Sequence, residues 1–160
     1  MNEQEHLFLS LVEQHKQIIY KVCFMYASDD ETIGDLFQEV MLNLWKAFPR
    51  FRGDSKPTTW IYRIAVNCCI SWLRSSRRHP QTVPLTISMN DLLADEQEKG
   101  NLQELYYLIN RLGKLDRALI LLWLDEQSYE EIAEILDISV SNVGVRINRI
   151  KTKLKSMSNN

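Results

Sequence analysis

The stretch SYEEIAEILDISVSNVGVRINRIKTKLK, at residues 128–155, carries the most specific pattern in the sequence. Ser128, with Glu131 three residues later, predicts a capping box that begins a helix. Asp137 is expected to end this helix in a left-handed turn, a conformation that Asp tolerates better than most residues other than Gly. Ser139 then caps a second helix. Two helices joined by so short a turn predict a helix-turn-helix unit.

The second helix of this unit is expected to have one buried side and one side that faces nucleic acid. Apolar residues spaced by three and four predict the buried side, which comprises Val140, Val143, Ile147, Ile150 and Leu154. The candidate contacts are Ser139, Ser141, Asn142, Val145, Arg146, Asn148, Arg149, Lys151 and Lys153. In the major groove Asn pairs with adenine and Arg with guanine, while Lys contacts phosphate. The alternative, a solvated helix in a bundle, is disfavoured because no acidic residue follows Asp137.

Charge alternates along the chain, although the net charge of its 160 residues is only −2. Residues 1–48 carry a net of −5 and residues 80–138 a net of −8, whereas residues 49–79 carry +6 and residues 139–160 carry +5. Each basic block closes its own helical segment. Two such blocks predict two surfaces that neutralise phosphates, while the acidic blocks face another partner.

Hydrophobic periodicity predicts helices in the rest of the first half as well. A first helix is expected at residues 5–27, with Leu7, Leu11, Ile18, Val22 and Met25 as its apolar side. A second is expected at residues 31–48, capped by Asp29 or Asp30 and buried through Leu36, Val40 and Leu44. After a loop at residues 51–60, Thr58 or Thr59 is expected to cap a third helix that runs to residue 78.

Residues 79–100 contain two prolines, Pro80 and Pro84, and polar runs with weak periodicity, which predict a linker. Two more helices, at residues 102–112 and 115–124, are expected before the helix-turn-helix unit. The predicted fold class is therefore all-α. Two small helical domains, at residues 1–79 and 101–160, are joined by a flexible linker at residues 80–100.

Composition argues against several classes of protein. No window of 18 uncharged apolar residues is present, so no membrane insertion is expected, and the acidic start predicts no secretory leader. We therefore expect a cytoplasmic protein whose Cys23, Cys68 and Cys69 are reduced. The histidines do not complete a metal site with these thiols. No nucleophile–base pair or phosphate-binding glycine loop is present either, so we expect no enzyme, no metal and no cofactor.

Three segments resemble a known family when they are read together and in order: DLFQEVMLNLWKAF at residues 35–48, TWIYRIAVNCCISWLR at 59–74, and LDRALILLWLDEQSYEEIAEILDISVSNVGVRINRIKTKL at 115–154. They resemble the extracytoplasmic-function sigma factors over nearly the whole chain. The resemblance implies an alternative sigma factor that binds core RNA polymerase and promoter DNA. It also implies an anti-sigma factor as a partner, and a protein that is monomeric when free.

The resemblance further implies roles for individual residues. The polymerase contacts would be Asp35, Gln38, Glu39, Leu42, Asn43 and Trp45. In the minus-ten region Phe51, Trp60 and Tyr62 would stack on bases, Asn67 would read a base edge, and Arg52, Lys56, Arg63, Arg74, Arg77 and Arg78 would contact the strand. Residues 139–153 would read the minus-thirty-five element. The family commonly carries charged or small polar residues where this chain has Gly144 and Val145.

Two other classes of function remain open at this point. A stand-alone helix-turn-helix transcriptional regulator would form a homodimer and bind a palindromic operator. A purely structural helical adaptor would make no contact with DNA. For Trp45 and Trp60 core packing is a competing expectation, and for Trp72 it is the favoured one.

Overall fold

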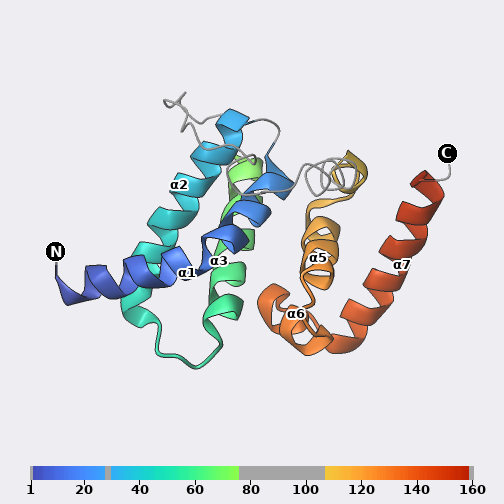
Figure 1. Cartoon of the computed structure of the whole chain (residues 1–160). Helices are drawn as coiled ribbons and strands as arrows, with labels where there is room; N and C mark the ends of the chain where they lie inside the picture. Colours follow the sequence, from blue (N-terminus) through green and yellow to red (C-terminus); the bar gives the residue numbers. More distant parts are fainter. Residues whose placement is uncertain (1, 28–29, 76–106, 159–160) are drawn as a thin grey trace. The chain divides into compact units, whose positions relative to one another are not determined.

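The computed structural model describes residues 2–27, 30–75 and 107–158, and all regular secondary structure in these ranges is helical (Figure 1). The chain divides into two compact units, Met1–Ser88 and Met89–Asn160. The predicted all-α fold with two helical domains is confirmed. The predicted linker at residues 80–100 lies outside the described residues, as do Arg77 and Arg78. In the described ranges no helix has the length and apolar character needed to cross a membrane.

The first unit contains α1 (Glu3–Tyr26), α2 (Asp30–Ala47), the short 3-10 helix η1 (Phe48–Arg50) and α3 (Pro57–Arg74). Asn2 caps α1, because its Oδ1 accepts the backbone N–H of Glu5 at 2.8 Å. The three α-helices pack against one another around a core that includes Ile19, Leu36, Val40, Leu44, Ile61 and Ala65. This bundle fixes the directions of the outer sides of α2 and α3.

The buried side of α1 differs in part from the prediction. Leu7 is 57% exposed, whereas the adjacent Phe8 is 5% exposed. Phe8 is buried because its ring packs edge-on against Trp45 and Phe48, at centroid distances of 5.1 and 5.3 Å. The predicted apolar side of this helix is therefore wrong by one residue in its first turns, and it is correct at Val22 and Met25.

The beginning of α3 also differs from the prediction. Lys56 is the N-cap and Pro57 is the first helical residue, so the helix begins three residues before Trp60. Pro suits this position because its φ is already helical and the missing N–H is one that a first turn cannot use. Thr59 is 2% exposed inside the bundle. The predicted cap at Thr58 or Thr59 is therefore wrong.

The second unit contains α5 (Lys114–Leu124), α6 (Tyr129–Leu136) and α7 (Val140–Ser158). The predicted capping box is confirmed: Ser128 Oγ accepts the Glu131 N–H, and the Glu131 carboxylate accepts the Ser128 N–H, both at 3.0 Å. Asp137 ends α6 with φ 57° and ψ 49°, the predicted left-handed conformation. The buried side of α7 is correct at Val143, Ile147 and Ile150, which are at most 2% exposed.

The prediction fails at the first residue of α7. Val140 was expected on the buried side, yet it is 42% exposed. Val140 is the first residue of α7, directly after the connection from α6. The first buried side chain of the helix is that of Val143, one turn later. The helix-turn-helix geometry itself is confirmed.

Candidate functional site

The outer side of α2 carries the residues that were predicted to contact polymerase. Leu42 is 46% exposed and Trp45 is 36% exposed, although both are large and apolar. Gln38 is exposed on the turn before them. Asp35 is half-buried, and Glu39 and Asn43 turn toward α3. The outer side of α2 therefore carries an exposed apolar pair beside polar side chains.

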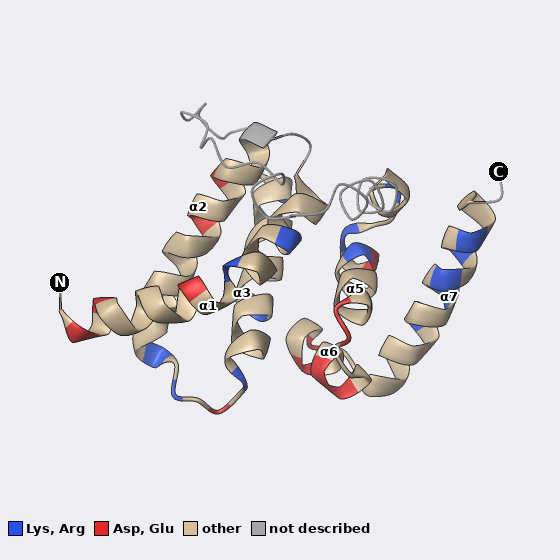
Figure 2. Ribbon diagram, viewed as in Figure 1, with Lys and Arg blue, Asp and Glu red and all other residues tan. Residues whose placement is uncertain are grey.

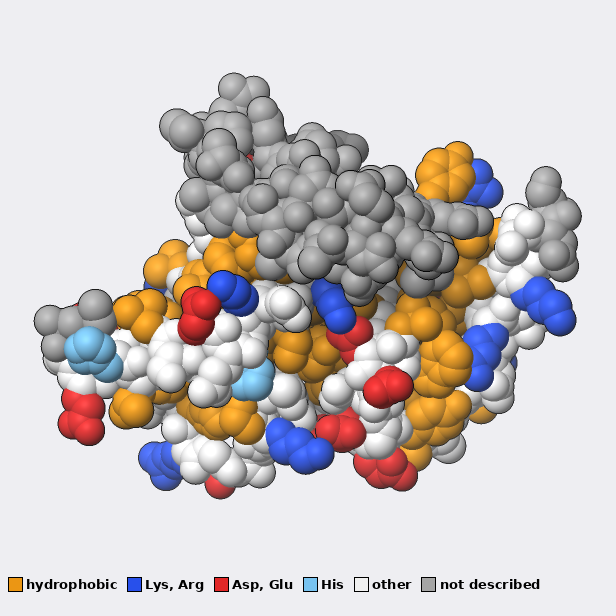
Figure 3. Space-filling view, in the orientation of Figure 1, with side chains coloured by type: hydrophobic (Ala, Val, Ile, Leu, Met, Phe, Trp, Pro, Cys, Tyr) orange, Lys and Arg blue, Asp and Glu red, His pale blue; other side chains and the backbone are white. Residues whose placement is uncertain are grey.

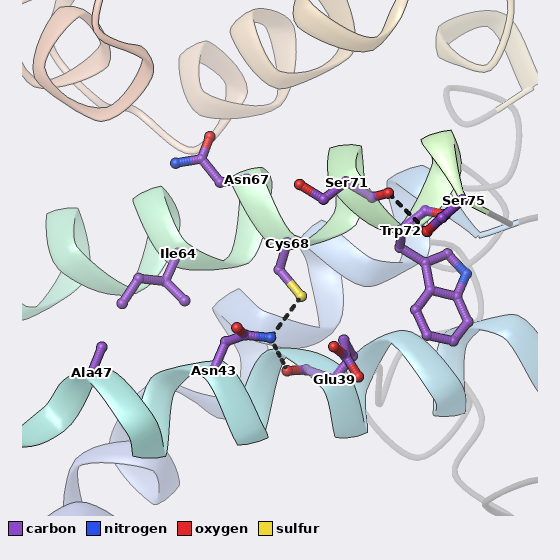
Figure 4. A pocket seen from close by; sticks show the side chains of 9 residues that line it. All are labelled: Glu39, Asn43, Ala47, Ile64, Asn67, Cys68, Ser71, Trp72 and Ser75. Atoms are coloured by element: carbon purple, nitrogen blue, oxygen red, sulfur yellow. Dashed lines mark hydrogen bonds between the residues drawn. The ribbon is translucent and has the colours of Figure 1, made fainter. Parts of the chain in front are cut away.

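A groove of about 410 Å³ lies between α2 and α3 (Figure 4). Its walls are formed by Glu39, Asn43, Ala47, Ile64, Asn67, Cys68, Ser71, Trp72 and Ser75. Cys68 points from α3 toward Asn43, whose amide donates to the Glu39 carbonyl at 2.8 Å and contacts Cys68 Sγ at 3.5 Å. The Asn67 amide points outward at the rim. The groove thus brings a predicted minus-ten residue beside two predicted polymerase contacts.

The thiols near this groove are weakly acidic. Burial raises the pKa of Cys68 from its ordinary value of 9.0 to about 12, and the neighbouring Cys69 and Glu39 add to the effect. A hydrogen bond with Cys23, together with burial, raises the pKa of Cys69 well above its ordinary value. All three cysteines are free. Each of these two thiols therefore stays protonated near neutral pH.

A continuous row of aromatic rings connects the outer side of α2 with the loop at residues 51–56. We call Trp45, Phe8, Phe48, Trp60 and Phe51 the aromatic row. Beyond the contacts of Phe8 with Trp45 and Phe48, the ring of Phe48 lies 6.3 Å from Trp60, and Trp60 stacks on Phe51 at 4.6 Å and 24°. Sequence reasoning missed Phe8 and Phe48, because nothing local marks two rings that meet across 40 residues.

The predicted minus-ten residues separate into surface and core. Arg52, Lys56, Asn67 and Arg74 are exposed, and Phe51, Trp60 and Arg63 are half-buried. Gly53, with φ 77°, turns the loop that carries Arg52 and Lys56. Tyr62 is 2% exposed, so its ring presents no stacking face on this surface. In the ribbon of Figure 2, Lys and Arg positions recur along the loop and α3, with few Asp or Glu positions among them.

The predicted minus-thirty-five residues lie on α7, mostly on its outer side. Ser141, Val145, Asn148, Arg149 and Lys153 are exposed. The Ser139 hydroxyl accepts the Asn142 N–H at 3.1 Å, so this hydroxyl serves as the N-cap of the helix. On the face drawn in Figure 3, Lys and Arg side chains line α7, and acidic side chains gather around α6 instead.

Two basic residues of α7 also contact α5. Arg146 Nη1 lies 3.5 Å from the Asp116 carboxylate, and Lys151 Nζ lies 4.1 Å above the ring of Trp123. Sequence reasoning gave Asp116 and Trp123 no role, since pairs separated by about thirty residues leave no local pattern. These contacts join α7 to α5. Both cations lie at the edge of the outer side of α7.

Tyr129 at the beginning of α6 lies beside Gly144 of α7. A Cβ atom at this position would lie 3.4 Å from Tyr129 Cε2. The ring at the beginning of α6 therefore packs onto the α7 backbone at the residue before Val145.

Comparison with known families agrees with both units. The family model for Sigma-70 region 2 matches residues 11–79, and the model for Sigma-70 region 4 matches residues 102–154. The RNA polymerase sigma factor YlaC of Bacillus subtilis (strain 168) is 34% identical over 155 residues, which span 91% of this chain and 88% of YlaC. The ECF RNA polymerase sigma-E factor of Escherichia coli (strain K12) is 30% identical over 158 residues, 90% of this chain and 82% of the relative.

The chain belongs to the extracytoplasmic-function (ECF) sigma factors. This sigma factor directs transcription initiation through RNA polymerase, and it is not an enzyme. The match to region 2 in the first half removes the stand-alone regulator and the helical adaptor as readings of the chain.

Solved structures share the fold of the sigma factor. The structure of CnrH in complex with the cytosolic domain of CnrY has a TM-score of 0.72 at 20% identity and covers 97% of this chain and 89% of that one. The sigma factor RpoE from Bartonella quintana, solved with the anti-sigma factor NepR, has a TM-score of 0.71 at 19% identity, with coverage of 95% and 96%.

Proposed function

We propose that this sigma factor divides its work among three surfaces. The polymerase surface is formed by Gln38, Leu42 and Trp45 on the outer side of α2, the half-buried Asp35, and Glu39 and Asn43 at its edge toward α3. The minus-ten surface comprises the loop at residues 51–56 and the exposed side of α3. The minus-thirty-five surface is the outer side of α7. The exposed, acid-free outer side of α7 is the observation that carries this assignment furthest.

The polymerase surface rests on Leu42 and Trp45. Trp is enriched among the residues that anchor protein interfaces, and the exposed Leu42 beside it adds apolar area that a partner can cover. Gln38 and Asp35 supply polar contacts at the rim. We expect the partner to be the clamp of the core polymerase, as the family resemblance implies.

The minus-ten surface rests on aromatic rings beside cations. Phe51 and Trp60 already stack on one another, so each ring lies where a separated base can extend the stack. Arg52, Lys56 and Arg74 are positioned to follow the strand, and Asn67 is exposed to read a base edge. The buried Tyr62 acts in the core instead, and we leave it out of this surface.

We also propose that an anti-sigma factor restrains the protein in the cytoplasm. The RpoE structure holds an anti-sigma factor, which supports the same class of partner here. The exposed apolar pair on α2 supports a regulator that covers the polymerase surface. Free of that partner the chain would be monomeric, and sedimentation of the purified protein tests this.

Transcription in vitro with core polymerase, over a library of promoters, tests the three surfaces. The double variant Leu42→Ala/Trp45→Ala should lose affinity for core enzyme. Arg149→Ala should keep that affinity and lose about tenfold in transcription from the selected promoters, since a base contact by Arg contributes about 1–3 kcal/mol.

The matched control is Lys16→Ala, which removes an exposed cation of α1 outside the three surfaces. It should change neither the affinity for core enzyme nor transcription. Unchanged core affinity in the α2 variant, in a protein that remains folded, contradicts the assignment of the polymerase surface.

A further inference from the structure

Val145 lies at the middle of the minus-thirty-five surface. It is two residues from both Val143 and Ile147, which are 0% exposed, so the helix turns it away from the core. It is 49% exposed. One turn to either side lie Ser141, Asn148 and Arg149, all polar and exposed. An apolar side chain therefore stands where its neighbours offer hydrogen bonds.

A valine at this position lowers helix stability relative to Ala, and about half of its surface remains exposed. β-branched residues are weaker helix formers than Ala or the long polar residues, and an exposed position returns little burial energy. Its rotamer, however, is nearly fixed in a helix, so both methyl groups hold one direction without further loss of entropy on binding. The ring of Tyr129 in α6 lies beside the preceding residue, Gly144, where an added Cβ atom would be 3.4 Å from it. Val145 thus presents a rigid apolar knob on a DNA-facing helix.

The major groove of DNA presents one apolar group that such a side chain can contact. Of the four bases only thymine presents a methyl group there, and apolar side chains recognise it by contact. We propose that Val145 reads the C5 methyl group of a thymine in the minus-thirty-five element. This inference rests on the proposed function of α7. It adds apolar readout by Val145 to the hydrogen-bonded readout by Asn148 and Arg149.

Replacement of single thymines by uracil tests this proposal, because uracil pairs with adenine and lacks only the methyl group. The probe is a promoter selected with core polymerase, in which each thymine of the minus-thirty-five element, on either strand, is replaced in turn. For the wild-type protein, one replacement should lower transcription about three- to fivefold, the effect of one buried methyl group. Val145→Ala should lose a similar factor on the thymine promoter and show no further loss on that uracil promoter.

Val140→Ala is the matched control. Val140 is a second exposed valine on α7, but it lies at the start of the helix, three residues from the buried Val143. This variant should keep the full sensitivity to uracil. Ala is the better helix former at both positions, so both variants should fold.

The outcomes separate this inference from the proposed function. Promoter-specific transcription with no uracil-sensitive position, or with equal sensitivity in the wild type and Val145→Ala, overturns the methyl contact and leaves the assignment of α7 intact. A selected element without any A·T pair overturns it as well. Failure of Arg149→Ala to affect any promoter contradicts the DNA-reading role of α7, and the methyl contact fails with it.

Discussion

Asp137 sits in the turn of the helix-turn-helix unit in a conformation that costs energy for any residue with a side chain. Its φ is 57°, and its backbone N–H donates to the Ala133 carbonyl. Gly removes the steric cost of the left-handed region, so Asp137→Gly should stabilise the second unit by about 0.5–1 kcal/mol. Hydrogen exchange of the α6 and α7 amides measures this locally.

Asp137→Ala is the control for this prediction. Ala keeps the steric cost and occupies the left-handed region less readily than Asp does, so this variant should be less stable than the wild type. If Gly and Ala changed the exchange rates in the same direction, strain at Asp137 would not be the cause.

The Cys68 thiol should be a poor nucleophile even though it lines the groove. Its pKa of about 12 leaves almost no thiolate near neutral pH, and the thiolate is the reactive form. At pH 8 we expect iodoacetamide to label Cys68 in the folded protein more than about tenfold more slowly than in the unfolded chain. Mass spectrometry of the labelled peptide gives both rates.

The same pKa shift sets a direction for stability. The folded protein holds the Cys68 proton more tightly than the unfolded chain does, so the contribution to stability is complete below pH 9, the ordinary pKa. It should decrease as the pH rises from 9 toward 12. If iodoacetamide labelled Cys68 in the folded protein at the rate of a free cysteine, its pKa would not be raised. Neither the slow labelling nor this dependence of stability on pH would then be expected.

At the scale of elements, the aromatic row links α2, α1, η1, the loop before α3 and the first turn of α3. Phe48→Leu removes the ring that touches both Phe8 and Trp60, and it should destabilise the first unit by about 1 kcal/mol. It should also loosen Trp60 and Phe51 and reduce opening of the minus-ten element. Permanganate reactivity of its thymines in complexes with core polymerase measures this opening.

Phe37→Leu is the matched control for the aromatic row. Phe37 is a half-buried ring of α2, as Phe48 is of η1, and it stacks on Tyr20 at 4.4 Å and 26°, outside the row. Its loss should lower stability by a similar amount and leave strand opening intact at saturating sigma factor. Equal defects in opening for the two variants would reduce the role of the row to general stability.

The elements that could be predicted from the sequence are those with local causes. The Ser128 capping box, the Asp137 turn and the buried side of α7 depend on residues within a few positions of one another. The beginning of α1 did not follow this rule, because Leu7 and Phe8 are adjacent and both apolar. Which of them is buried depends on Trp45 and Phe48, far along the chain.

The candidate site shows the same division between local and distant causes. The exposed outer side of α7 could be predicted from spacing alone. The burial of Tyr62 and the contact of Arg146 with Asp116 could not, since both depend on how separate helices pack. The groove beside Cys68 likewise exists only once α2 and α3 are brought together.

For the whole molecule, the distribution of charge matters more than its sum. Basic blocks of +6 and +5 alternate with acidic blocks of −5 and −8, so the chain as a whole is weakly anionic. Phosphate attracts the loop, α3 and α7 and repels α2 and α6. The bases of the minus-ten element are also paired and stacked in duplex DNA, where Phe51 and Trp60 cannot reach them.

The free sigma factor should therefore bind duplex promoter DNA weakly and gain affinity with core polymerase. Core enzyme would cover the polymerase surface, which includes the acidic Asp35 and Glu39, and would hold the opened strand against the minus-ten surface. In gel-shift titrations we expect a large gain in affinity on addition of core enzyme, and a shallow salt dependence for the free chain because few phosphates are neutralised. Arg149→Ala should weaken the ternary complex in proportion to its loss in transcription. Tight, sequence-specific binding by the free chain, at the affinity of the ternary complex, would contradict this account, since α7 alone would then suffice for promoter recognition.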